Sequence, residues 1–131
     1  MLHPSQFQVN EAWIAFQLND EPIRTEQDGS FNCVALMDAA SCFILGSKLV
    51  PIEESELSQL DARRLLKEGW KHKKQLPTTL FVPKGQFQTI LPDEAKRQGI
   101  SVVSLLESEL LIFIGEARDG FREHVQGKGR Q

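Results

Sequence analysis

The feature that most constrains the fold is the order in which apolar runs of strand length and amphipathic stretches follow one another. Three apolar runs occupy residues 11–18, 31–37 and 42–46, and residues 19–22 (Asn-Asp-Glu-Pro) and 28–30 (Asp-Gly-Ser) are turn chemistry between the first two. We predict three antiparallel strands here, the second of them apolar enough to be buried on both faces.

The rest of the chain alternates between helix and strand patterns. We predict helices over residues 54–70, 86–98 and 107–125, and strands over 78–82 and 100–105. Pro92 must kink the second helix or start a new helical piece, and Gly99 is a good C-cap. The order β-β-β-α-β-α-β-α predicts an α/β (α+β) fold, a mixed five-stranded sheet with helices on its faces.

Composition indicates one domain and no membrane segment. The chain has 131 residues, of which 40% are hydrophobic, and we expect a single domain over 1–131, with a core over about 11–125. Residues 1–10 and 126–131 are expected to be flexible ends. The first residues lack a basic segment followed by an apolar one, so we expect no signal peptide and a cytoplasmic location.

The two cysteines are predicted to be reduced. If residues 38–41 form a tight hairpin turn, Cys33 lies near Gly46 and Cys42 near Met37. The two thiols then do not face each other, so a disulfide is not expected. Two small buried hydrophobic side chains in a reducing cytoplasm explain them.

Charge is distributed unevenly along the chain. The net charge is −3, so no overall basic field attracts nucleic acid. Residues 1–60 carry two basic and nine acidic side chains, whereas residues 61–131 carry thirteen and nine. Solvated faces explain this asymmetry most simply, and an interaction surface is the alternative.

Several motifs, weak individually but correctly ordered, resemble the catalytic cores of transposases and retroviral-type integrases. Residues 31–46 (FNCVALMDAASCFILG) resemble the segment from the second to the third strand of those cores. Residues 80–87 (LFVPKGQF) are similar to their fourth strand and the turn after it, and Gly99-Ile100 to the pair before their fifth strand. Trp13 matches a tryptophan three residues before their first catalytic Asp. The resemblance implies a ribonuclease H-like fold over residues 11–125.

The resemblance also implies where metal-binding carboxylates should stand. Integrase-type cores hold divalent metal with two Asp and one Glu, because hard cations require clustered carboxylate oxygens. The positions that match the two Asp residues are Phe16 and Pro83, and neither side chain can ligate a metal. The third position falls in the last helix near Arg118 or Asp119, with Glu116 and Glu123 close by.

Two hypotheses follow from these replacements. The first is a non-catalytic integrase-core-like domain without cofactors, an interaction module for a protein partner or for a second copy of itself. The second is a divergent Mg²⁺- or Mn²⁺-dependent nuclease or polynucleotidyl transferase whose carboxylates have moved. The acids available for it are Asp20, Asp38, Glu116 and Asp119, with Asp28 as a further candidate. We favour solvated acids over a converging site, and for Asp38 a cap on the turn to Ser41.

A basic segment supports a third hypothesis, a nucleic-acid-binding domain that does not cut. The candidate contacts are Arg63, Arg64, Lys67, Trp70, Lys71, His72, Lys73 and Lys74. The cations could follow a phosphate backbone, most directly through residues 71–74, while Trp70 stacks on a base. We favour a helix whose Trp70 packs into the core while its lysines face water, because Trp70 falls on the apolar stripe.

Other chemistry finds no support in the sequence. His3, His72 and His124 have no zinc-ligand spacing around them, and the pattern Gly-x-Ser-x-Gly does not occur. No glycine-rich loop of a nucleotide site is present either.

Overall fold

The computed structural model describes residues 2–87 and 89–129, and the side chains as far as His124. A short 3-10 helix at Pro4–Gln6 precedes the sheet. The strands are β1 (Ala12–Gln17), β2 (Ile23–Thr25), β3 (Gly29–Asp38), β4 (Ile44–Pro51), β5 (Thr79–Pro83) and β6 (Ser101–Leu105). The helices are α1 (Gln59–Lys73), α2 (Ile90–Arg97) and α3 (Glu107–Gly129).

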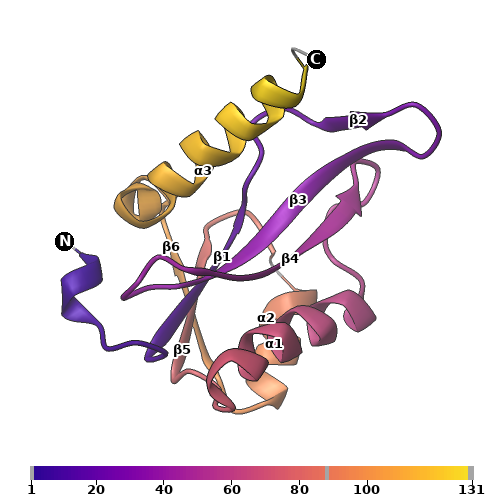
Figure 1. Cartoon of the computed structure of the whole chain (residues 1–131). Helices are drawn as coiled ribbons and strands as arrows, with labels where there is room; N and C mark the ends of the chain where they lie inside the picture. The colour runs from indigo at the N-terminus through magenta and orange to yellow at the C-terminus, as the bar shows by residue number, and fades with distance from the viewer. Residues whose placement is uncertain (1, 88, 130–131) are drawn as a thin grey trace.

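The strands form one mixed sheet (Figure 1). Val34 of β3 stands opposite both Gln17 of β1 and Lys48 of β4, so these two strands flank β3 on opposite edges. Both pairs are antiparallel, whereas β1 with β5 and β5 with β6 are parallel. The three-stranded meander and the two crossovers predicted from the sequence are therefore present.

Strand β2 is a sixth strand that the sequence did not reveal. It pairs antiparallel with the start of β3, where Ile23 stands opposite Phe31 and Thr25 opposite Gly29. Only Ile23 of its three residues is even half-buried. A strand of three mostly exposed residues buries too little to show an alternation of apolar and polar side chains in the sequence. Its presence depends on pairing with β3, which a local pattern does not reveal.

The hairpin between β3 and β4 is wider than predicted, and the predicted register is wrong. In the observed register Cys33 stands opposite Leu49, and Met37 opposite Ile44. The Asp38 amide donates to the Phe43 carbonyl at 2.9 Å, so the turn includes more residues than a tight hairpin. Cys33 is buried, Cys42 is half-buried, and both are free thiols.

The sheet divides the core into two layers. Trp13 and Ala15 of β1 face a layer formed with α1 and α2, whereas Ile14 and Phe16 face a layer formed with α3. This alternation follows from the two-residue period of a strand. Figure 1 shows α1 and α2 on one side of the sheet and α3 on the other. Residues 33–38 of β3 are buried, as predicted for a strand covered on both faces.

Helix α1 begins at Gln59, later than predicted, because Ser58 is its N-cap. The Ser58 hydroxyl accepts a hydrogen bond from the Asp61 amide at 3.1 Å, the standard arrangement at a helix start. The buried face carries Ala62, Leu65, Leu66 and Gly69, which is helical spacing.

Helix α2 begins at Ile90, so Pro92 stands in its first turn and causes no kink. The amides of that turn have no partner inside the helix, so a proline removes no hydrogen bond there. Residues 86 and 87 precede the helix, and Gln88 of the predicted stretch lies outside the described residues. Gly99 has a φ of 86° and follows the C-cap, as predicted.

Each end of the chain carries an element outside the predicted core. Phe7 lies in the segment expected to be flexible. The centre of its ring lies 5.8 Å from that of Phe81, in an edge-on arrangement, and 6.1 Å from that of Phe113, in a tilted one. Helix α3 continues to Gly129, and residues 130–131 of the expected flexible tail lie outside the described residues. Among the described helices, none has the length and apolar character needed to cross a membrane.

Candidate functional site

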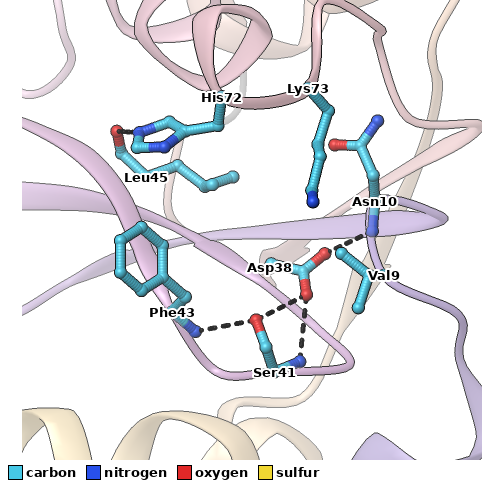
Figure 2. Close-up of a pocket in the computed structure, with 8 residues that line it drawn as sticks. All are labelled: Val9, Asn10, Asp38, Ser41, Phe43, Leu45, His72 and Lys73. Carbon is cyan, nitrogen blue, oxygen red and sulfur yellow. Dashed lines mark hydrogen bonds between the residues drawn. The ribbon is translucent and has the colours of Figure 1, made fainter.

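The buried carboxylate of Asp38 caps the β3–β4 turn, as the sequence predicted (Figure 2). It accepts hydrogen bonds from the Ser41 amide at 2.9 Å and the Ser41 hydroxyl at 2.7 Å. It also accepts one at 2.7 Å from the amide of Asn10, which fastens the N-terminal segment to the turn. Asp38 lies in a cavity of about 350 Å³ together with His72 and Lys73 of α1. One of its oxygens is thus bound by the turn and the other by the N-terminal segment.

The charges of Glu116 and Asp38 both act on the thiol of Cys42. The pKa of Cys42 is raised, first by burial and then by the negative charges of Glu116 and Asp38. Burial also raises the pKa of Cys33. Both thiols are therefore protonated at neutral pH, which makes them weak nucleophiles and weak metal ligands.

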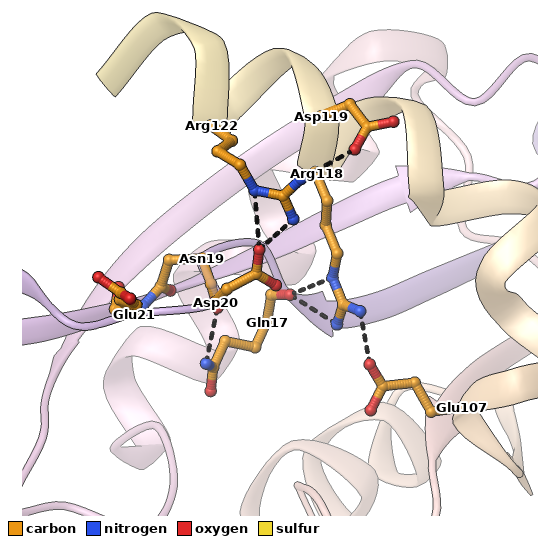
Figure 3. Close-up of polar contacts among 8 residues, drawn as sticks. All are labelled: Gln17, Asn19, Asp20, Glu21, Glu107, Arg118, Asp119 and Arg122. Atoms are coloured by element: carbon orange, nitrogen blue, oxygen red, sulfur yellow. Dashed lines mark hydrogen bonds and ion pairs between the residues drawn. The ribbon is translucent and has the colours of Figure 1, made fainter. Parts of the chain in front are cut away.

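Asp20 and Asp119 both bind the guanidinium of Arg122 (Figure 3). Arg122 of α3 donates hydrogen bonds to Asp20 and lies 3.3 Å from Asp119. The hydrogen bond from Arg122 is the main reason why the pKa of Asp20 is lowered, with smaller contributions from the charges of Arg122 and Arg118. Asp20 in turn raises the pKa of Arg122.

The candidate acids are thus divided between two places on the molecule. Asp20 and Asp119 lie at Arg122, whereas Asp38 and Glu116 lie near Cys42. Asp28 is exposed in the turn between β2 and β3. Over residues 2–87 and 89–129, no group of three His, Cys, Asp or Glu side chains could hold a metal ion.

A half-buried arginine lies where the resemblance places the metal-binding residues. Phe16 is fully buried at 0% exposure, and the guanidinium carbon of Arg118 lies 5.9 Å from the centre of its ring. Arg118 donates to the Gln17 carbonyl from Nε at 3.1 Å and from Nη2 at 2.9 Å, and forms an ion pair with Glu107 (Figure 3). Its side chain is only 13% exposed. Pro83 is buried at the end of β5.

The residues here do not fit a divalent metal ion. Phe16 and Pro83 offer no side-chain oxygen, and the carboxylate of Glu107 is already neutralised by Arg118. A fixed guanidinium also repels a metal cation, and the repulsion is strong where the side chains exclude water. The role of Arg118 was missed because sequence periodicity does not reveal that a residue of the last helix reaches the first strand.

The basic segment at the end of α1 is divided between two faces of the helix. His72 and Lys73 line the cavity that contains Asp38, where the His72 ring lies 3.0 Å from the Leu45 carbonyl. A second set lines a separate cavity of about 620 Å³, here called the α1 groove. The residues that line the α1 groove are Leu60, Arg63, Arg64, Lys67, Trp70, Leu76 and Gln98.

Trp70 is exposed, and the preference for packing it into the core was wrong. Its exposure is 38%, and Lys74 Nζ lies 4.9 Å from the centre of its ring. The preceding residue, Gly69, faces the core instead: a Cβ there would stand 2.7 Å from Trp13. Successive helical residues point about 100° apart, so Trp70 turns toward the edge of the buried face. Gly69 continues the three- and four-residue spacing of the buried Ala62, Leu65 and Leu66. A search for apolar side chains alone does not include a glycine, so it assigns the core position to Trp70 instead.

A buried carboxylate of α2 was also missed. Glu94 accepts hydrogen bonds from Arg63 of α1 at 3.1 Å, from Arg97 at 2.9 Å and from Gln98 at 3.2 Å. Burial alone would raise the pKa of Glu94, but the hydrogen bonds from Gln98 and Arg63 and the two arginine charges outweigh it, and the pKa is lowered. Glu94 therefore links α2 to α1 and stays ionised.

Comparisons with known proteins find similarity in structure only. No model of a known protein family and no curated protein matches the sequence. The catalytic core domain of BIV integrase is 12% identical with a TM-score of 0.60, over 93% of this chain and 74% of that one. The HTLV-2 integrase catalytic core domain in complex with magnesium is 8% identical with a TM-score of 0.51, over 83% and 82%.

A third similar structure belongs to a larger assembly. An integrase chain of the simian T-cell lymphotropic virus intasome, in complex with PP2A regulatory subunit B56 gamma, is 11% identical with a TM-score of 0.51. The match covers 87% of this chain and spans 41% of the length of that one. The three similarities confirm a ribonuclease H-like fold of the integrase-core type.

Proposed function

We propose that this protein is a non-catalytic ribonuclease H-like domain that functions as a protein-interaction module and needs no metal cofactor. The observation that carries the proposal is Arg118, whose guanidinium lies over Phe16 and is held by Gln17 and Glu107. A cation of the protein itself thus stands at the site that the resemblance assigns to metal-binding carboxylates.

Three of the acids that could have replaced the missing ligands are held by other groups. Arg122 neutralises Asp20 and Asp119, and the turn amides hold Asp38. A metal ion at any of these carboxylates would have to displace the hydrogen bonds that hold it. Phosphoryl transfer requires metal ions placed together against the phosphate, and these positions do not converge.

A role in binding is supported by what the fold leaves at its surface. The α1 groove contains an exposed tryptophan and two arginines, residue types that are enriched at protein interfaces. An assembly built on the same fold, the simian T-cell lymphotropic virus intasome, is in complex with another protein. The two free cysteines support a reducing compartment, and we place the domain in the cytoplasm.

Calorimetric titration with MnCl₂ and with MgCl₂ tests the absence of a metal site. We expect no site-specific heat at micromolar metal, and no cleavage of single- or double-stranded DNA or RNA in either metal. The matched variants are Asp20→Asn, Asp38→Asn and Asp119→Asn, which remove the candidate ligands singly. Micromolar binding by the parent that one of these variants abolishes would overturn the proposal in favour of a divergent metal-dependent nuclease.

A further inference from the structure

We propose that the α1 groove binds an acidic protein segment that carries one large apolar side chain. This inference rests on the proposed interaction role and names its surface and its partner chemistry. The groove combines an apolar lining, from Leu60, Trp70 and Leu76, with a row of cations along the same helix.

The apolar lining is accessible in the folded chain. Leu60 is 52% exposed and Trp70 38%, and Leu76, which follows α1, is half-buried beside them. Tryptophan contributes more binding free energy than most residues at interfaces, because it buries a large rigid surface at small entropic cost. The cavity of about 620 Å³ has room for a large apolar side chain together with neighbouring residues of the partner segment.

Four cations in or next to the α1 groove are available to a partner: Arg64 and Lys67 line it, and Lys71 and Lys74 follow them along the chain. Arg64, Lys67, Lys71 and Lys74 form no ion pair among the described residues, and all four are exposed. Lys74 lies over the Trp70 ring and presents its ammonium beside the apolar lining. An acidic partner would gain charge-assisted contacts next to its apolar anchor.

The distribution of charge along α1 favours a protein segment over a nucleic acid. The exposed Glu53 and Glu54 stand in the loop that leads into the helix, and Asp61 in its first turn. The free cations extend from Arg64 to Lys74, toward the other end. A uniform phosphate backbone would be repelled at the acidic end, whereas a peptide can place its acidic residues only beside the cations.

Selection from a phage-displayed library of random peptides tests the proposal. We expect the enriched peptides to combine Asp or Glu with one Leu, Phe or Trp. Their affinity, measured by fluorescence anisotropy, should fall about tenfold or more with Trp70→Ala and with Lys67→Glu/Lys71→Glu. Circular dichroism melting confirms that the variants fold, since these side chains lie outside the core.

Matched controls locate the effect at the groove. Leu60→Ala should weaken binding, whereas Leu111→Ala, an equally exposed leucine of α3 (49%), should not. Lys84→Glu, an exposed cation after β5, controls for net charge.

Three results would overturn the α1 groove assignment. One is enrichment of peptides without acidic residues, and another is binding that Trp70→Ala leaves unchanged. The third is tighter binding, through Trp70, of an oligothymidylate of about 15 nucleotides or of a second copy of the chain. Each of these would leave the non-catalytic function standing if the metal titrations remain silent, so the two failures are distinguishable.

Discussion

Helices α1 and α3 cover opposite faces of the same sheet by different physical means. At Gly69 of α1 an added Cβ would stand 2.7 Å from Trp13 and 2.9 Å from Leu36, so this helix is positioned by shape. At Gly115 and Gly120 of α3 an added Cβ would have nothing within 4 Å. Besides its own apolar contacts, α3 is anchored to β1 and the segment after it by Arg118 and Arg122.

The two helices also differ in where they place their charged side chains. Arg118 of α3 holds the carboxyl end of β1, where a metal site would need carboxylates. The close packing of α1 at Gly69 leaves Trp70 and the cations pointing outward. Helix α3 therefore places an arginine over Phe16, and helix α1 leaves a tryptophan exposed.

Removal of the Arg118 side chain, which anchors α3 to β1, should have the largest effect on stability. Arg118→Met should lower the free energy of unfolding by about 3 kcal/mol, because the Gln17 carbonyl and Glu107 lose a half-buried partner. Urea unfolding measures it. Arg118→Lys is the control for charge, and it should recover only part of the loss, since an ammonium lacks the forked geometry. A loss of less than about 0.5 kcal/mol would show that α3 is held by its apolar face alone.

The two glycines should respond to alanine with opposite signs. Gly69→Ala should lower the free energy of unfolding by about 2 kcal/mol, because the buried Trp13 ring must move. Gly115→Ala, in the open space around α3, should raise it by up to about 1 kcal/mol through helix propensity. Denaturant unfolding of both variants decides the matter. If both variants change the free energy of unfolding in the same direction, the two helices do not differ in how closely they pack at these glycines.

A substitution of Glu94 tests whether charge also contributes to stability on the face of the sheet covered by α1 and α2. Glu94→Gln should cost about 1.5 kcal/mol at neutral pH, since its ionised carboxylate binds Arg63 of α1. The pKa of Glu94 is lowered on folding from its ordinary 4.5, so the stabilisation is complete above that pH. It is lost as the pH falls below 4.5 through the lowered value. The parent and the variant should therefore converge in stability in acid, and a difference that persists there would contradict the assignment.

The smallest effect is expected at the exposed Asp20–Arg122 pair. Asp20→Asn should lower the melting temperature slightly at low salt, and the difference should vanish near 1 M NaCl, where charges are screened within about 3 Å. Lys84→Asn, at an exposed lysine outside this pair, is the control. If the difference between parent and variant is insensitive to salt, the pair does not anchor α3 by charge.

Most of the fold was readable from the sequence because its strands and helices carry strong local patterns. The meander, the two crossovers and the cap by Asp38 on the Ser41 turn all depend on residues close together in the chain. Strand β2 and the β3–β4 register were not readable, since pairing between strands is set by partners that a local pattern does not contain. Trp70 was misplaced because a glycine occupied the core position beside it.

The sequence by itself determined that this chain builds an integrase-type core with Phe16 and Pro83 where carboxylates belong, since residue identity alone decides which side chains can ligate a metal. Only the tertiary structure decided that Arg118 reaches Phe16 across the fold and that the remaining acids separate into two places. It also decided that Trp70 is exposed and lines the α1 groove. These outcomes depend on how each helix is rotated against the sheet, and the packing of distant side chains sets that rotation.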